Sequence, residues 1–478
     1  MLNPVLMISG YIISVLGIIM LIPAGLDLIQ EDMEWSHFIS GGIITIFVGV
    51  SLFLANYAKI ERITLKQGYL LTAVSWLFTI LFSAIPFVLT ETVPSVADAI
   101  FEAASGITGT GATIMKNVES LPKSILLWRS ILNALGGLGI VIFAVALLPF
   151  LGIGGMQMFQ RENSDSSDKF MPKFSYIAKR IVFVYCLLTM IACGTLFLCG
   201  MNWFDALNHA MSAIGTGGFS TKNNSIAFYN SPKIEWVIML FMLAGSLPMT
   251  FYILLLRRGN PDKYNQISVF LKTVVFFSLS VGIWLFLNSN YGLIDSLRYG
   301  AFSVIATVTT TGLSTVDYTD WGVWATSVFL LLSFCGGCTG STSGSIKIFR
   351  WQTIHAFLKK YILSAVEPHR VVPLKIGNIN ASDKVTTSVF VYVFSFIFCL
   401  VFLGLVVSLA GVNFQTSIAA VTACITNVGV GSINIIGPSG NYAFFSPTVK
   451  IILAFAMLLG RLEVITVMVL LSRSFWRK

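Results

Sequence analysis

The sequence has little charge. Only 11% of its 478 residues are Asp, Glu, Lys or Arg, whereas 56% are hydrophobic. Soluble domains carry about 25% charged residues, so this chain lacks much of the charge that a water-facing surface needs. The shortage excludes an ordinary soluble domain and a disordered chain. With a mean hydropathy of +0.84, the composition predicts several membrane-spanning helices, each of which satisfies its own backbone groups.

Cysteine and histidine are also scarce, and neither is arranged for chemistry. The seven cysteines are odd in number and lie in or beside apolar runs, so they predict no disulfide framework. The sequence has no Ser-His-Asp arrangement and no zinc motif, so we expect no enzyme activity. The four histidines lack metal-ligand spacing and are interpreted as surface or loop residues: His37, His209, His355 and His369.

The net charge of +9 does not indicate a nucleic-acid partner, because the basic residues cluster between apolar runs. By the positive-inside rule, this pattern predicts that the basic segments and both termini are cytoplasmic. The connection 346–385 is basic enough to bind anionic lipid headgroups or a soluble partner. The basic segments lie at 59–66, 161–180, 257–272, 347–384 and 473–478.

Ten apolar runs are long enough to cross a membrane, which takes about 20 residues of helix. The first has no basic residues before it and no cleavage site, so it predicts a membrane helix and not a signal peptide. The runs lie at 4–25, 38–58, 68–90, 125–152, 176–200, 234–256, 269–288, 322–338, 386–411 and 448–472.

Four semi-polar stretches between these runs are too short to span the membrane, and they predict re-entrant half-helices packed inside protein. They lie near 97–109, 203–215, 294–310 and 414–427. Each ends in a strip rich in Gly, Thr and Ser, and the strips recur roughly every hundred residues. Alignment of the strips on one glycine each predicts four repeats around a shared axis: Gly111, Gly217, Gly312 and Gly429.

A cation filter explains why four such strips would share one axis. A dehydrated cation needs oxygen ligands, and carbonyl groups of an extended backbone supply them. Glycine adopts the required backbone angles at low cost, and the half-helices would aim their negative ends at the ion. The alternative is that the strips are packing turns. Polar residues near the half-helix starts are interpreted as N-caps, or as groups that attract cations: Asp98, Asp205, Asp295 and Asn413.

The sequence resembles the bacterial TrkH/KtrB/TrkG superfamily of potassium-uptake membrane subunits. Four motifs in the family's order carry the resemblance: 105–113 (SGITGTGAT), 136–140 (GGLGI) continuing to 151–157 (LGIGGMQ), 336–342 (GGCTGST) and 460–463 (GRLE). Two spans before the first repeat make it more similar to TrkH than to KtrB. The resemblance implies an all-α membrane protein with four pseudo-symmetric helix–pore loop–helix repeats around one pore. We expect an N-terminal two-helix extension at 1–66 and pore repeats at 67–160, 161–260, 261–384 and 385–478.

The resemblance also implies the ion ligands and the partners. Gly109 stands where the family usually has Thr, and the fourth strip has no Thr, so it would contribute carbonyls alone. The family is homodimeric in the bacterial inner membrane and works with a cytosolic TrkA-like nucleotide-binding subunit, with no organic cofactor on this chain. The positions carried over as potassium ligands are Thr110, Gly111, Thr216, Gly217, Thr311, Gly312, Val428 and Gly429.

The segment 335–345 holds glycines too closely spaced for a straight helix. Its spacing does not fit a phosphate-binding P-loop, and its two cysteines lack the βαβ context of a redox motif. In the family, such a loop gates the pore below the filter. The family commonly has three glycines where this chain has Ser-Gly-Ser at 343–345, which predicts a stiffer gate. The expected gate glycines are Gly336, Gly337, Gly340 and Gly344.

Arg461 lies near the middle of the last predicted span, where an unpaired charge costs at least about 2.5–3.5 kcal/mol. It either pairs with a carboxylate or faces the pore, repels cations and bonds the gate loop. Glu463 is two residues on and points to another face, so it is not the expected partner. We expect Arg461 to be part of the gate.

The sequence thus predicts a channel-like potassium translocator. The alternatives are a proton- or sodium-coupled potassium symporter and, from another class, a non-conducting membrane scaffold or receptor.

Overall fold

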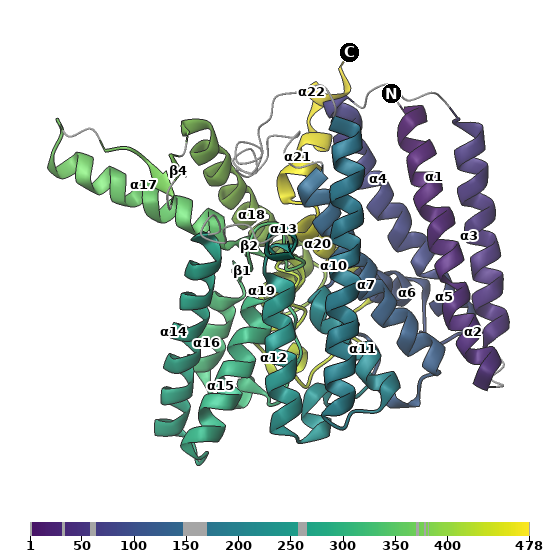
Figure 1. Cartoon of the computed structure of the whole chain (residues 1–478), viewed down its shortest axis with the longest axis horizontal. Coiled ribbons are helices and arrows are strands. Elements are labelled where there is room, and N and C mark those ends of the chain that lie inside the picture. The colour runs from purple at the N-terminus through teal and green to yellow at the C-terminus, as the bar shows by residue number, and fades with distance from the viewer. Residues whose placement is uncertain are drawn as a thin grey trace.

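The computed structural model describes residues 2–30, 34–57, 64–146, 170–256, 265–369, 372–376, 379–380 and 382–477. The predicted segment 151–157 lies outside these described residues, and so do parts of all five basic segments: 59–63, 161–169, 257–264, 370–371, 377–378, 381 and 478. Almost all regular structure is helical, in agreement with the all-α prediction. Figure 1 shows both chain ends at the same end of the bundle.

An N-terminal pair of helices precedes the repeats. Helix α1 (Leu2–Ile19) continues through α2 (Leu21–Gln30) and packs along α3 (Trp35–Ala55). The contact depends on glycine, because a side chain at Gly10 or Gly49 would meet the backbone of the other helix at 2.6–2.7 Å. The two helices therefore form one closely packed layer against the first repeat.

Four units follow, each with an entering helix, a half-helix, a strip and a leaving helix. The first contains α4 (Leu65–Ser83), α5 (Ile85–Leu89), α6 (Val96–Thr108) and α7 (Lys123–Ala146). The second contains α10 (Phe170–Leu198), α11 (Trp203–Gly215), α12 (Pro232–Ser246) and α13 (Met249–Leu256).

The third and fourth units complete the bundle. The third has α14 (Asn265–Asn288), α15 (Leu293–Val308), α16 (Val323–Leu332), β1 (Cys335–Gly336), β2 (Ile346–Lys347) and α17 (Ile348–Val366). A short hairpin, β3 (Lys375–Ile376) with β4 (Ile379–Asn380), leads on to the fourth unit. That unit has α18 (Asp383–Leu409), α19 (Phe414–Ile425), α20 (Pro447–Arg461), α21 (Val464–Leu471) and α22 (Arg473–Trp476).

The number of spans differs from the ten apolar runs predicted, and the difference lies in the leaving helices. Among the described residues, seven helices are long and apolar enough to span a membrane, or nine if each bent pair counts once. The pair α12–α13 bends by 93° and the pair α20–α21 by 108°. The predicted span 322–338 is wrong as a helix, because α16 stops at Leu332 where the glycine-rich segment begins. Arg461 is the last residue of α20 and lies at the bend between α20 and α21.

The four half-helices are confirmed, but the assignment of N-caps is wrong for the acids. The side-chain caps are Ser95, Asn202 and Asn413, and Gly292 caps the third half-helix without a side chain. Asp98, Asp205 and Asp295 lie inside the first turn and form ion pairs with Lys450, Lys222 and Arg298. A negative charge in the first turn is still favoured by the helix dipole.

Candidate functional site: a ring of four backbone strips

All four half-helices end in the same backbone pattern. After each helix, one residue takes a left-handed conformation, and the N–H of the next residue donates to a carbonyl five residues back. The left-handed residues are Gly109 (φ 64°), Thr216 (φ 49°), Thr310 (φ 56°) and Asn427 (φ 55°). The donors that follow are Thr110, Gly217, Thr311 and Val428, at 2.9, 2.8, 2.9 and 3.1 Å.

This pattern corrects the alignment of the second strip by one residue. The glycine that follows each donor is again left-handed: Gly111 (φ 79°), Gly218 (φ 78°), Gly312 (φ 73°) and Gly429 (φ 76°). Gly217 is therefore the counterpart of Thr110 and not of Gly111. The sequence pattern favoured the wrong glycine because strip 2 has two adjacent glycines. Gly217 lacks a side chain because of its packing, whereas Gly218 has the left-handed backbone angles. A side chain at Gly217 would lie 2.2–2.6 Å from atoms of the Asn133 side chain.

The four strips close into a ring. A methyl group on Gly111 would meet the carbonyl oxygen of Gly217 at 2.6 Å. The same addition at each of the other three glycines would collide with a carbonyl of the neighbouring strip: Gly218 with Thr311, Gly312 with Val428, and Gly429 with Thr110. The strips thus lie in the order 1–2–3–4–1. They converge on one axis and are not separate packing turns.

We call the end of the ring at which the half-helices stop its inner end, and the end from which the strips leave its outer end. Because each helix stops at its strip, four negative helix ends point at the ring. The structure therefore combines carbonyl oxygens with helix dipoles of the sign that favours a cation.

A belt of hydrogen bonds surrounds the outer end. In each strip, the carbonyl two residues beyond the left-handed glycine accepts a hydrogen bond from the preceding repeat. We call these four carbonyls and their donors the outer belt. The pairs are Tyr442 N to Thr113 O (2.8 Å), Arg129 Nη1 to Ser220 O (3.1 Å), Ile226 N to Ser314 O (3.0 Å) and Tyr318 Oη to Gly431 O (3.1 Å).

Two tyrosines hold the fourth strip. Tyr442 Oη donates to the carbonyl oxygen of Gly429 at 2.9 Å, and Tyr318 binds Gly431 in the belt. Burial raises the pKa of Tyr318, so its phenol keeps the proton that it donates. Since the Gly429 carbonyl has this partner, the glycine contributes mainly its conformation, and Val428 presents the carbonyl next to the third strip.

The loop 336–345, which we call the inner loop, lies against the inner end. Strands β1 and β2 pair in parallel and close the base of the loop. The backbone N–H of Gly344 donates to Thr310 Oγ1 at 2.6 Å, and Thr216 Oγ1 donates to Thr342 Oγ1 at 3.2 Å. Thr310 and Thr216 are left-handed residues of the ring, so the loop touches the ring itself.

Two serines of the inner loop, Ser343 and Ser345, are both hydrogen-bonded. Ser343 Oγ accepts from the backbone N–H of Gly337 at 3.1 Å and lies 2.8 Å from Ser341 Oγ. Ser345 Oγ donates to Ser333 O at 2.6 Å. Lys347 also donates to the Ser343 carbonyl. These bonds tie the loop to itself and to the end of α16.

Arg461 joins the inner loop to the bundle without a carboxylate partner among the described residues. Its Nη1 donates to Thr342 O at 2.8 Å and its Nη2 to Gly136 O at 3.1 Å. The side chain is buried, and Nη2 would lie 3.3 Å from a methyl group on Gly109. The predicted hydrogen bond to the loop is confirmed, and the absence of Thr at position 109 leaves room for the guanidinium beside strip 1.

Glu463 pairs elsewhere, as predicted. It forms an ion pair with Arg350, whose guanidinium lies 3.6 Å from the centre of the Tyr392 ring. Arg350 follows the inner loop in the first turn of α17, and Glu463 lies at the bend after Arg461. The pair therefore links the element that leaves the loop to the bend that positions Arg461.

Several residues of this site were not predicted. His209 was interpreted as a surface or loop residue, but it is buried and lies 2.9 Å from Ser220 Oγ through Nε2. Glu102 and Arg129 form a buried ion pair behind strips 1 and 2. One signal was available: Glu102 and His209 both stand nine residues before a left-handed glycine, Gly111 or Gly218.

The comparisons with known proteins agree with this geometry. A model of the TrkH family, described as a cation transport protein, matches residues 35–478. The Trk system potassium uptake protein TrkI of Halomonas elongata is 35% identical over 478 residues, which cover 99% of this chain and 97% of TrkI. TrkH of Escherichia coli K12 is 30% identical over 481 residues, 98% of each chain.

A solved structure extends the likeness to the whole fold. The crystal structure of the potassium transporter TrkH from Vibrio parahaemolyticus matches with a TM-score of 0.92 and 27% identity, and each chain is covered completely. The resemblance found in the sequence motifs is confirmed. The chain belongs to the TrkH family of cation transport proteins.

Proposed function

We propose that this protein carries potassium into the bacterial cell through the ring of four strips. The observation that supports this most strongly is the closed ring, in which each strip's left-handed glycine adjoins a carbonyl of its neighbour. Such a ring can replace the water that a cation loses. Relatives at 30–35% identity are Trk system potassium uptake proteins. The negative membrane potential would drive entry, at about 2.3 kcal/mol per charge per 100 mV.

The ion ligands in this proposal are the strip carbonyls. The residues expected from the sequence keep their places in strips 1, 3 and 4: Thr110, Gly111, Thr311, Gly312 and Val428, with Gly429 contributing its left-handed conformation because Tyr442 Oη donates to its carbonyl. In strip 2, Thr216 is retained at the left-handed position, Gly217 becomes the counterpart of Thr110, and Gly218 joins the set as the counterpart of Gly111. Potassium is the cargo and not a resident cofactor.

The gate in this proposal consists of the inner loop and Arg461. The loop is bonded to two left-handed residues of the ring, Thr310 and Thr216. Arg461 adds a positive charge beside strip 1, and that charge repels a cation leaving the ring. Passage would require Thr342 and its neighbours to move away from the inner end. Gly336, Gly337, Gly340 and Gly344 would supply the backbone freedom for that movement.

The membrane orientation and partners complete the proposal. Both termini share one end of the bundle with the basic α17 region (Figure 1), and the positive-inside rule favours the cytoplasm for that end. We infer an inner-membrane homodimer whose cytoplasmic face accepts a TrkA-like nucleotide-binding subunit. The exposed Leu358, Tyr361 and Ile362 of α17, next to Lys359 and Lys360, suit that face to a protein or to anionic lipid. The chain's division into an extension and four pore repeats belongs to the same proposal.

Rubidium uptake into proteoliposomes tests this function. Purified protein should take up rubidium at a rate that follows an imposed inside-negative voltage, with or without a proton gradient. Sodium gradients are varied in a parallel series. Uptake that strictly requires a proton or sodium gradient would replace the channel-like mechanism with coupled symport. No rubidium uptake by folded protein, with empty liposomes as the control, would contradict the proposal and favour the non-conducting alternative.

A further inference from the structure

The outer belt is chemically uneven. Three of its four carbonyls accept from neutral donors: the backbone N–H groups of Tyr442 and Ile226, and the Tyr318 hydroxyl. At Ser220, the donor is the guanidinium of Arg129. Burial of a charged side chain inside a membrane protein costs free energy. The use of a charged donor at the Ser220 carbonyl, and at no other carbonyl of the outer belt, therefore needs a specific explanation.

Glu102 and Arg129 are almost completely enclosed. The side chains are 0% and 2% exposed, and Arg129 Nε lies 2.8 Å from Glu102 Oε1. The guanidinium also lies 4.1 Å from the centre of the Phe219 ring. Removal of one partner would leave the other charge buried without compensation, which is far more costly than the loss of an exposed pair.

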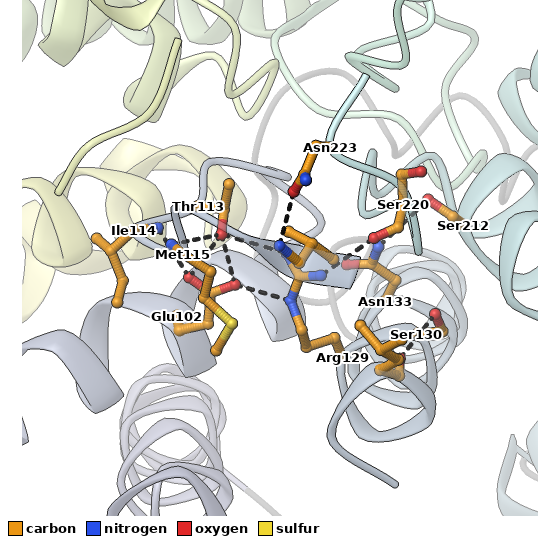
Figure 2. Close-up of polar contacts among 12 residues, drawn as sticks. Glu102, Thr113, Ile114, Met115, Arg129, Ser130, Asn133, Ser212, Ser220 and Asn223 are labelled. Carbon is orange, nitrogen blue, oxygen red and sulfur yellow. Dashed lines mark hydrogen bonds and ion pairs between the residues drawn. The ribbon is translucent and has the colours of Figure 1, made fainter. Parts of the chain in front are cut away.

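Each member of the pair also bonds to a strip, as Figure 2 shows. Glu102 Oε1 accepts from Thr113 Oγ1 at 2.9 Å, and Oε2 accepts from the backbone N–H of Ile114 at 3.1 Å. Arg129 Nη2 donates to Thr113 Oγ1 at 3.2 Å, while Nη1 donates to Ser220 O at 3.1 Å. The pair therefore connects strip 1 to strip 2 through bonds of fixed direction.

The geometry of the two groups makes this connection stiff. A guanidinium is planar and presents its donors in a fixed fork, unlike the flexible ammonium of lysine. Thr113 and Ser220 stand two residues beyond Gly111 and Gly218, so a change in their separation would move the adjoining ring carbonyls. A filter selects an ion by the spacing and number of its carbonyl oxygens.

We propose that Glu102 and Arg129 are positioning residues that fix the separation of strips 1 and 2 and thereby set the preference for potassium over the smaller sodium ion. The proposal rests on the proposed potassium-uptake function. It assigns no contact between either side chain and the ion. Repeat 2 has His209 at the position of Glu102, and repeats 3 and 4 have Ser303 and Ala420. The charged connection between two strips that Glu102 and Arg129 form, which we call the brace, therefore lies on one side of the ring.

Three variants separate this role from simple structural support. R129K keeps the charge but lacks the planar fork, R129Q removes the charge, and E102Q keeps the size of the acceptor without its charge. The matched control is E235Q. It breaks another buried ion pair, Glu235 with Arg298 (3.0 Å), which joins α12 to α15 without contacting a strip.

The experiment measures rubidium and sodium uptake by equal amounts of monodisperse protein in liposomes, together with the thermal stability of each variant. We expect R129K, R129Q and E102Q to lower the rubidium-to-sodium ratio by roughly three- to tenfold, the size of couplings within one hydrogen-bond network. E235Q should lower stability and leave the ratio unchanged. The double variant E102R/R129E tests the bonds to the strips: it restores a pair of charges but not the donor to Ser220, so the ratio should stay low.

Several outcomes would overturn the proposal. It is wrong if folded R129K keeps the wild-type ratio, if every variant loses rubidium and sodium uptake in equal proportion, or if the charge swap restores the ratio. If R129Q does not fold, the rubidium-to-sodium ratio of R129K tests the proposal. Wild-type protein that takes up neither ion would refute the proposed function. If the wild-type protein is selective and the variants have the same rubidium-to-sodium ratio, only the proposed role of Glu102 and Arg129 is refuted.

Discussion

Two buried arginines lie at opposite ends of the same ring. Arg129, at the outer end, is neutralised by Glu102 and bonded to strips 1 and 2. Arg461, at the inner end, donates to two backbone carbonyls, and no described carboxylate pairs with it. The side chains have the same chemistry and similar burial, at 2% and 3% exposed.

The difference lies in the compensation of the charge. A paired arginine has little net field at a distance and acts through its fixed hydrogen bonds. An arginine held only by carbonyls keeps most of its charge and acts on a nearby cation through space. We therefore expect changes at the outer end to alter which ion passes, and changes at the inner end to alter how fast ions pass.

The largest expected effect comes from breaking the ring on which both arginines act. Gly429→Ala would place a methyl group against the Thr110 carbonyl at a left-handed position. We expect rubidium uptake to fall about 100-fold or more, since a penalty near 3 kcal/mol corresponds to that factor. The control is Gly411→Ala, which is also left-handed (φ 91°) but has no neighbour within 4 Å. Equal losses in the two variants would mean that strain and not the ring geometry is responsible.

The second variant removes the uncompensated charge at the inner end. Arg461→Gln should raise rubidium flux roughly tenfold, because the loss of about 1.4 kcal/mol of like-charge repulsion at the inner end corresponds to that factor. Arg461→Lys keeps the charge and should remain close to wild type. Stopped-flow flux into liposomes measures both variants. A glutamine variant with unchanged flux would show that the charge does not limit passage.

A smaller effect is expected from loosening the inner loop. The double variant S343G/S345G deletes the hydroxyls that bind Gly337 N–H and Ser333 O. We expect flux to rise about threefold with no change of selectivity, because each lost hydrogen bond is worth about 0.5–1.5 kcal/mol. Ser439→Gly, in an exposed loop beyond the outer end, is the control. A fall in flux would contradict the idea that these serines hold the loop in place.

The smallest effect is expected at a neutral contact of the outer belt. Tyr318→Phe removes the donor to Gly431 O and keeps the ring that stacks on Phe329. We expect the rubidium-to-sodium ratio to fall about twofold, as for one neutral hydrogen bond, with flux nearly unchanged. The exposed Tyr57→Phe serves as the control. A loss of selectivity as large as that of R129Q would remove the distinction between charged and neutral belt contacts.

Much of this architecture was predictable from local pattern. Apolar runs located the long helices, and the semi-polar stretches located α6, α11, α15 and α19 to within a few residues. The register of strip 2 was not predictable, because two adjacent glycines satisfy the same pattern and only the backbone angles distinguish Gly217 from Gly218. The Glu102–Arg129 pair was missed because each is a single charged residue in a different helix, and only the fold brings the two together.

The sequence by itself determined the membrane class, the four half-helices, the glycine-rich strips and the family, because composition, run length and short motifs depend on residues near one another in the chain. Only the tertiary structure decided the order of the strips in the ring, the bends in the α12–α13 and α20–α21 pairs, and the partners of Arg129 and Arg461. Those features join residues of different repeats, and the physical reason is that a buried charge or carbonyl takes its partner from whatever the folded chain brings within about 3 Å.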